Sequence, residues 1–308
     1  MPIKIPDNLP ARATLEKERI RLISKTRAIT QDIRPLRVLL LNLMPDKIST
    51  ETQLLRALGM TPLQVDPVFI RTASYKGSNT PSAHIDAFYK TWADVKHQRF
   101  DALIVTGAPV EQMPFEDVAY WPELKEIFDW SLDNVYSSFF ICWGAQAALY
   151  HFHGVNKNDV SEKHFGIYPH EIKDLYDPLV AGFDDISYIP VSRHTEIHKS
   201  DVEAHTDLKI LLESDVTGVC LLSGEDSRQV YMFNHLEYDA ETLKKEYMRD
   251  VGQGLSTAVP YNYFPEDNPQ IMPPVTWRAH RTMLFTNWLN MIYQATPYNL
   301  DDLPPFKL

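Results

Sequence analysis

Cys142 lies where a strand meets a helix, a position from which a cysteine can act as a nucleophile. A β-rich run from Val135 to Ile141 leads into it, and WGAQ then opens an alanine-rich helix. In a nucleophile elbow the side chain at such a turn is exposed above the sheet edge, and Gly144 removes a side chain that would collide there. The helix N-terminus favours a thiolate at Cys142. We therefore predict that Cys142 is a nucleophile, whereas Cys220, in the strand-like GVCLLSG, is expected to be buried and unreactive.

A nucleophile needs a base, and His235 and Glu237 supply a candidate pair in the segment FNHLEY. Residues two apart on an extended segment share a face, so the carboxylate can orient the imidazole. Such a pair is weak support when taken alone. Its place between a strand and a helix makes His235 the predicted base and Glu237 its orienting group.

Strands and helices alternate along the chain that must position these residues, which is typical of a mostly parallel α/β sheet flanked by helices. In the first half, the expected strands cover 37–44, 63–73, 101–109 and 135–141, and the expected helices cover 48–59, 82–97 and 121–134. Pro67 places the second strand at an edge or a bulge. Four short strands are expected within 184–235, and two helices near 239–251 and 276–294. We expect an amino-terminal arm at 1–34 and one domain at 35–308 with a helical extension at its end.

Composition excludes several classes of protein. The 308 residues carry 30 Lys and Arg against 41 Asp and Glu, a formal net charge of −11, which argues against general nucleic-acid binding. Two cysteines cannot form a disulfide framework, and the longest strongly apolar run is too short to cross a bilayer. The start of the chain contains no apolar core of a secretory signal, so a cytoplasmic protein is expected. His151 and His153 come without a full ligand set, so we expect no metal.

The segments ICWGAQ and NHLE resemble the class I glutamine amidotransferases, whose pattern is G-[IV]-C-x-G-x-Q with a later H-P-E. Phe140 stands at the first glycine of that pattern and Leu236 at the proline. The resemblance implies the flavodoxin-like fold of these enzymes. The two departures weaken the case for glutamine hydrolysis.

Longer motifs are similar to the homoserine O-acyltransferases of the homoserine transsuccinylase family, which share the amidotransferase-like fold. They are LLLNLMPDKISTETQLLRALG, GAPVEQMPFEDVAYW, FICWGAQAALYHFHG, YMRDVGQG, VPYNYFPEDNP and MLFTNWLNMIYQATPY. The resemblance implies that a cysteine takes an acyl group from acyl-CoA and passes it to the hydroxyl of L-homoserine, which begins methionine synthesis from homoserine. It also implies a homodimer, with acyl-CoA as a co-substrate and no permanently bound cofactor.

The resemblance further implies that Lys163, Ser192 and Arg249 contact substrate. A guanidinium such as that of Arg249 suits a planar grip on the carboxylate of an amino acid. Backbone N–H groups would form the oxyanion hole. We expect one of them from Trp143 and one from the turn at Gly107-Ala108.

Glu111 occupies the position that separates acetyl from succinyl users in this family, where Glu accompanies acetyl and Gly accompanies succinyl. Succinyl-CoA carries a free carboxylate that a second carboxylate would repel. At ~5 Å and an effective dielectric of ~20 the repulsion is roughly 3 kcal/mol, about a hundredfold in rate. We therefore predict acetyl-CoA as the donor. The alternatives are succinyl-CoA as the donor, a glutamine-hydrolysing amidotransferase, a non-enzymatic sensor that reuses the cysteine, and a Glu111 that points to solvent from a loop.

Overall fold

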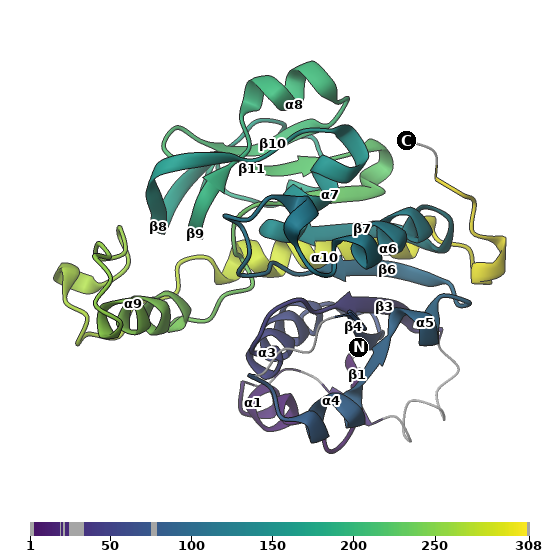
Figure 1. The fold of residues 1–308 in the computed structure, drawn as a ribbon. Coiled ribbons are helices and arrows are strands. Elements are labelled where there is room, and N and C mark those ends of the chain that lie inside the picture. Colours follow the sequence, from purple (N-terminus) through teal and green to yellow (C-terminus); the bar gives the residue numbers. More distant parts are fainter. Residues whose placement is uncertain (1–2, 19, 21, 25–33, 75–78, 307–308) are drawn as a thin grey trace.

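Ten strands form one sheet in the computed structural model, which describes residues 3–18, 20, 22–24, 34–74 and 79–306 (Figure 1). The strand order is β5-β4-β3-β6-β7-β12-β11-β10-β8-β9. The first six of these run parallel, and each remaining strand is antiparallel to its neighbour. The predicted α/β class with a mostly parallel sheet is thus confirmed. The strands are β3 (Leu36–Leu41), β4 (Val65–Arg71), β5 (Tyr89–Thr91), β6 (Phe100–Val105), β7 (Val135–Ile141), β8 (Asn158–Ile172), β9 (Ile186–Glu196), β10 (Lys209–Ser214), β11 (Gly218–Ser223) and β12 (Gln229–Met232).

Helices cover both faces of the parallel strands, which is why these strands are apolar without alternation. In β3, Val38 and Leu40 pack into one core with α3 and α10, whereas Leu39 and Leu41 pack into a second core with α6 and α7. The helices are α1 (Ala11–Lys17), α3 (Lys47–Leu58), α4 (Ser82–Phe88), α5 (Trp92–Val95), α6 (Trp121–Asn134), α7 (Trp143–His153), α8 (Lys199–His205), α9 (Thr242–Gly252) and α10 (Arg278–Ala295). Short 3-10 turns are η1 (Phe115–Asp117), η2 (Pro178–Val180), η3 (Glu225–Ser227), η4 (Pro265–Asp267) and η5 (Leu300–Asp302).

The helix expected over 82–97 is wrong in its middle. The helix α4 ends at Phe88, and Tyr89–Thr91 form the strand β5, which pairs with β4 from Phe69 onward. Pairing with the edge of β4 stabilises these three residues as a strand, although their sequence pattern favours a helix. Pro67 precedes the stretch that β5 covers, so it lies on the open side of β4, as an edge position requires.

The amino-terminal segment is joined to the main core where the structure describes it. β1 (Ile3–Ile5) pairs in parallel with β2 (Leu22–Ser24), and the buried side chains of Ile3, Ile5 and Leu15 belong to the core that contains α3. The described residues of the expected arm therefore contribute to the hydrophobic core.

The chain that leaves α9 is tied back to the body at two points. Tyr261 donates its N–H to Phe165 O at 2.9 Å and accepts from Ile167 N at 2.8 Å, so it crosses β8 at Gly166. A Cβ on Gly166 would lie 2.3 Å from the backbone oxygen of Tyr261, so only glycine permits this crossing. The Tyr263 hydroxyl donates to Ala240 O near the start of α9. Among the helices in the described ranges, none is both long enough and apolar enough to span a bilayer.

Candidate active site

Cys142 lies at the turn between β7 and α7, at the carboxyl edge of the parallel strands (Figure 1). Its backbone has φ 53° and ψ −120°, which is a strained conformation for a residue with a side chain. Cys142 N donates to Met232 O at 2.7 Å, which fixes the turn to the end of β12. The strand–turn–helix geometry expected for an elbow is present, and the Cys142 side chain is partly exposed.

The backbone after β6 packs against this elbow. A Cβ placed on Gly107 would lie 3.1 Å from Cys142 Cβ, and one on Gly144 would lie 2.6 Å from Thr106 O. Trp143 is the first residue of α7, where an N–H has no acceptor within the helix. The two segments expected to supply oxyanion donors, Trp143 and Gly107-Ala108, therefore meet at Cys142.

His235 follows β12 and is held from three sides. Its Nδ1 lies 2.7 Å from Glu237 Oε1, its backbone N–H donates to Pro190 O at 2.9 Å, and its ring stacks on Tyr238 with the centroids 4.0 Å apart. Both His235 and Glu237 are 6% exposed. Contact through Nδ1 leaves Nε2 as the nitrogen for proton exchange.

The charge of His235 is coupled to Cys142 and Glu237. Burial opposes the charged imidazole, but the charge of Glu237 and then that of Cys142 outweigh it and hold the pKa of His235 well above its usual range. Proximity to Cys142 and Glu237 therefore favours an imidazolium in the resting enzyme. The three predicted catalytic residues are adjacent in the structure although 93 positions separate Cys142 from His235.

Tyr238 connects this trio to two further carboxylates. Burial raises the pKa of Tyr238 well above its usual range, and the charges of Glu246, Glu237, Cys142 and Glu111 act in the same direction. These four groups therefore all lie close enough to Tyr238 for their charges to act on its hydroxyl.

Lys163, Ser192 and Arg249 converge on α9, and their common partner is Glu246, a residue that the sequence reasoning missed. Glu246 Oε1 lies 2.7 Å from Lys163 Nζ and accepts from Ser192 Oγ at 2.9 Å. Arg249 Nη2 lies 2.6 Å from Asp250 Oδ1. Glu246 lies three and four residues before Arg249 and Asp250, so helical spacing could have placed all three on one face. A cluster that contains both cations and carboxylates can bind the two opposite charges of a zwitterion.

Glu111 lies in the loop after β6 with its carboxylate turned to β9 rather than to solvent. Glu111 Oε2 accepts from His194 N at 3.0 Å and from Thr195 Oγ1 at 3.3 Å. Lys157 Nζ donates to the backbone oxygens of Glu111 and Met113, which holds the loop.

Arg193 is a second residue that the sequence reasoning missed. It is 2% exposed and donates to Asn234 Oδ1 at 3.3 Å and to the backbone oxygens of Thr195 and Thr217. Burial lowers the pKa of Arg193, and the charge of Cys142 is the strongest opposing influence. No sequence pattern indicated that Arg193 is buried, because arginine side chains are mostly exposed.

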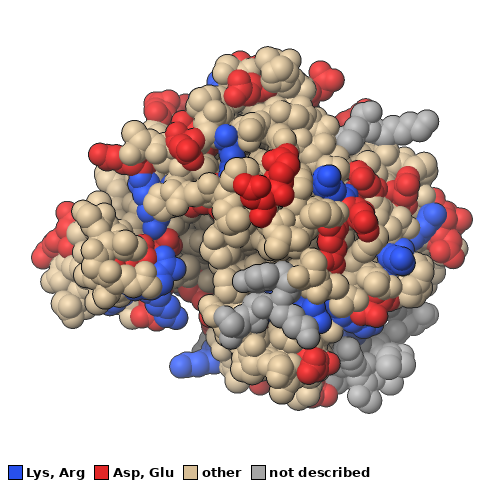
Figure 2. All heavy atoms as spheres, viewed as in Figure 1, with Lys and Arg blue, Asp and Glu red and all other residues tan. Residues whose placement is uncertain are grey.

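The remaining candidates are structural. Burial raises the pKa of Cys220 to about 12, so this thiol is unreactive as expected. His151 pairs with Asp129 and His153 with Tyr231. Among the described residues, no three or more metal-ligating side chains come together as a group that could hold an ion. On the face shown in Figure 2, acidic and basic side chains are interspersed among the residues drawn in colour, without a continuous basic surface.

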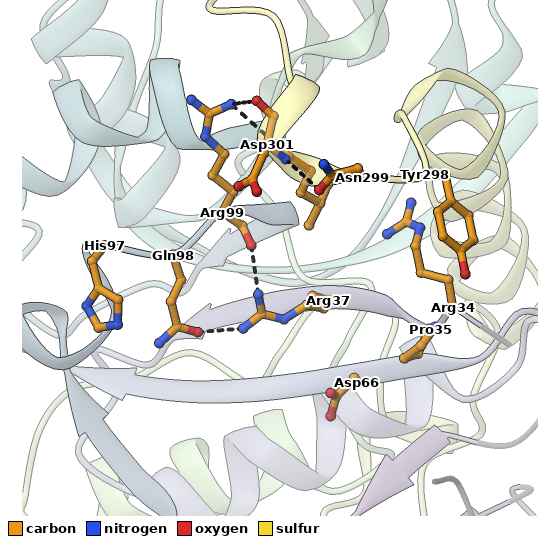
Figure 3. Close-up of a pocket in the computed structure, with 11 residues that line it drawn as sticks. Arg34, Pro35, Arg37, Asp66, His97, Gln98, Arg99, Tyr298, Asn299 and Asp301 are labelled. Atoms are coloured by element: carbon orange, nitrogen blue, oxygen red, sulfur yellow. Dashed lines mark hydrogen bonds between the residues drawn. The ribbon is translucent and has the colours of Figure 1, made fainter. Parts of the chain in front are cut away.

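A separate cavity of about 350 Å³ lies at the amino ends of β3 and β6 and is remote from the elbow (Figure 3). Its arginines already have partners within the protein. Arg34 pairs with Asp101, Arg37 donates to Gln98 Oε1 at 2.6 Å, and Arg99 donates to backbone oxygens near the carboxyl terminus. The cavity holds none of the residues that surround Cys142.

Comparisons with known proteins agree on both fold and family. The family described as homoserine O-succinyltransferase matches residues 2–298. Curated proteins named homoserine O-acetyltransferase from Petrotoga mobilis, Acetivibrio thermocellus and Brevibacillus brevis are 52%, 52% and 53% identical over 98% of this chain, and the alignments cover 98%, 100% and 99% of those proteins.

Solved structures with a similar fold include glutamine amidotransferases. A glutamine amidotransferase from Thermotoga maritima aligns with TM-score 0.56 at 11% identity, over 84% of this chain and 99% of that one. The glutaminase domain of CTPS from Trypanosoma brucei aligns with TM-score 0.52 at 11% identity, over 84% and 94%. At these identities the likeness concerns the fold alone.

Proposed function

The chain belongs to the homoserine O-succinyltransferase family, and on that premise we propose that it transfers an acetyl group from acetyl-CoA to the side-chain hydroxyl of L-homoserine. The observation that carries the proposal is the elbow cysteine Cys142 beside the buried pair of His235 and Glu237. The names of the relatives support the choice of acetyl. The product enters methionine synthesis.

In the first half of the reaction, the Cys142 thiolate attacks the thioester carbonyl of acetyl-CoA. The carbonyl oxygen becomes an oxyanion, which the N–H groups of Trp143 and the Gly107-Ala108 turn stabilise without reorganisation. The bond from carbon to the CoA sulfur breaks, and the CoA thiolate takes the proton of His235. This leaves an acetyl-enzyme and a neutral imidazole.

In the second half, the acetyl-enzyme has lost the negative charge of Cys142, one of the charges that raise the pKa of His235. His235 then accepts the hydroxyl proton of homoserine as its oxygen attacks the acetyl carbon. Collapse of the intermediate releases O-acetylhomoserine and restores the Cys142 thiolate beside the imidazolium.

Homoserine is a zwitterion, and the cluster on α9 offers both signs of charge. Arg249 pairs with Asp250, but its side chain is 59% exposed and can also take the carboxylate of homoserine, with Lys163 beside it. Glu246 would accept the ammonium group, with Ser192 holding its other oxygen. The charge of Glu246 acts on Tyr238, which stacks on His235, so this cluster lies near the proposed base.

The test is intact-mass detection of an acyl adduct on Cys142. Acetyl-CoA alone is expected to label the wild-type protein and to leave Cys142→Ala unlabelled, and homoserine is expected to discharge the label as O-acetylhomoserine. Faster labelling by succinyl-CoA would assign the succinyl alternative. A label that homoserine does not discharge, or release of ammonia from glutamine without acyl transfer, would contradict the proposal.

Three further parts of the proposal rest on the family resemblance. The protein acts as a homodimer, so light scattering should give about twice the 35.5 kDa of one chain. It holds no cofactor permanently, with acetyl-CoA as a co-substrate only. It works in the cytoplasm.

A further inference from the structure

Two hydrogen-bond donors of β9 converge on one oxygen of the Glu111 carboxylate. The donors are the backbone N–H of His194, at 3.0 Å, and the hydroxyl of Thr195, at 3.3 Å. Thr195 is fully buried, so its hydroxyl needs a partner within the protein. Two donors aimed at one carboxylate oxygen form a small anion receptor.

The hydroxyl of Thr195 is oriented from the side of the nucleophile. Gln146 Nε2 donates to Thr195 Oγ1 at 3.0 Å, and the one hydrogen of this hydroxyl is within reach of Glu111 Oε2 at 3.3 Å and of Gln146 Oε1 at 3.1 Å. Gln146 is 2% exposed, and its own backbone N–H donates to Cys142 O at 3.1 Å. The Thr195 hydroxyl is thus held in place by a side chain of the helix that begins at the elbow, and it stays within reach of a carboxylate at the position of Glu111.

The receptor is linked to the nucleophile through Gln146, which lies on the helix that follows Cys142 and contacts Thr195. Gln146 is four residues after Cys142, about 6 Å along the axis of α7, and helical side chains lean back toward the N-terminus. A four-carbon acyl chain on Cys142 would cover a comparable distance. The charges of Glu111 and Cys142 both act on Tyr238 and on Arg193, so both groups lie near these two side chains.

We propose that the His194 N–H and the Thr195 hydroxyl are the receptor for the far carboxylate of a dicarboxylic acyl group, and that Glu111 fills this receptor with its own carboxylate. The inference rests on the proposed acyl transfer. A buried carboxylate without hydrogen bonds is costly, so an acyl group that ends in a carboxylate needs such donors. In this chain the donors are occupied, and a second carboxylate would also meet the charge of Glu111.

Lys157 has a different part in this arrangement. Its Nζ donates to the backbone oxygens of Glu111 and Met113, so it secures the loop and leaves the carboxylate to β9. Thr195 is therefore the specificity-determining side chain that this receptor predicts in addition to Glu111.

The experiment measures the rate at which acetyl-CoA and succinyl-CoA acylate Cys142, by intact mass and without homoserine. Glu111→Gly is expected to raise the ratio of the succinyl to the acetyl rate. Adding Thr195→Val should lower that ratio at least about tenfold, as for the loss of a hydrogen bond to a charged group. Adding Thr195→Ser, which keeps the hydroxyl, should preserve it.

Thr217→Val in the same background is the matched control, because Thr217 is equally buried and its hydroxyl faces His170 instead. Its ratio should equal that of Glu111→Gly alone. An unchanged ratio in Glu111→Gly/Thr195→Val, or equal loss in the Thr195→Ser and Thr217→Val variants, would overturn the receptor. If Glu111→Gly is acetylated but its ratio of succinyl to acetyl rate does not rise, the receptor is overturned and the proposed function stands. If neither ester acylates Cys142, the proposed function is overturned and the receptor with it.

Discussion

His235 carries the proton through both halves of the proposed reaction, and Glu237 sets how strongly it is held. Both side chains are buried, and their 2.7 Å contact leaves only one ring nitrogen for exchange. The Glu237 carboxylate has two roles: it fixes the tautomer of the neutral imidazole, and it stabilises the imidazolium.

Replacing Glu237 by Gln should therefore lower both activity and the pKa of His235. The folded-state pKa of His235 is raised, chiefly by the charge of Glu237 against the effect of burial, so removing that charge shifts the titration to lower pH. We expect kcat to fall about 10²-fold or more. Histidine NMR titration measures the shift, and steady-state rates measure the loss.

Glu203→Gln on the exposed side of α8 is a suitable control, with rates and titration like those of the wild type. A Glu237→Gln protein that is folded and titrates at the wild-type pH would show that Glu237 does not act on His235.

At the scale of elements, the approach of α7 to the end of β6 defines the elbow. Gly144 makes this approach possible, because a Cβ there would lie 2.6 Å from Thr106 O and 3.0 Å from Val105 O. Both atoms belong to the backbone, so neither can move aside as a side chain would.

Gly144→Ala should accordingly lower the free energy of unfolding by more than about 2 kcal/mol and displace Cys142 from the oxyanion donors. Urea unfolding and acylation of Cys142 measure the two effects. Gly252→Ala at the end of α9 is the matched control, since nothing lies within 4 Å of its added Cβ, and it should be neutral or slightly stabilising. Equal stability of the two variants would mean that the packing of α7 tolerates a side chain.

The elements that carry the nucleophile could be predicted from the sequence because their signals are local. The strand before Cys142 is rich in residues that favour strands, and the helix over Trp121–Asn134 has the predicted limits. The strand β8 was not predicted, because NDVSEKHFGIYPHEI is largely polar and contains Pro169. Its pairing with β9 along most of its length, which no local pattern reveals, makes it a strand.

The same distinction holds within the candidate site. Cys142, His235 and Glu237 were suggested by short spacings, whereas Glu246 meets Lys163 across 83 positions. The orientation of Glu111 was also beyond a sequence argument, because its donors belong to a strand that begins 75 positions later. Residues whose partners come from distant strands need the fold before their role is visible.

Over the whole molecule, the carboxyl-terminal segment packs against the amino ends of the parallel strands, where Tyr298, Asn299 and Asp301 line a cavity together with Arg99 (Figure 3). Arg99 Nη1 donates to Asp301 O at 2.8 Å and lies 3.2 Å from the backbone oxygens of Leu300 and Leu303. Phe306 N donates to Leu132 O at 2.9 Å. The guanidinium of Arg99 thus binds several backbone oxygens of the carboxyl-terminal segment, which is not part of a strand.

Arg99→Ala should lower the free energy of unfolding by about 1–3 kcal/mol, because these carbonyl groups lose a charged donor. Thermal unfolding measures the effect, and the rate of acylation of Cys142 in the folded variant should be unaffected. Arg12→Ala offers the comparison, since Arg12 forms exposed pairs with Asp7 and Glu16, and such pairs contribute little. Loss of stability in Arg12→Ala as large as in Arg99→Ala would assign the effect to charge in general.

The crossing of Tyr261 over Gly166 bears on the timing of catalysis. It anchors the chain beyond α9 to β8, while Tyr263 holds the start of α9, so the segment after the helix ties the element that carries Glu246 and Arg249 to the sheet. In the proposed reaction, homoserine would therefore meet a wall whose anchoring hydrogen bonds are already formed. We therefore expect the ordering of α9 to add little entropic cost to the encounter with homoserine in the second half of the proposed reaction.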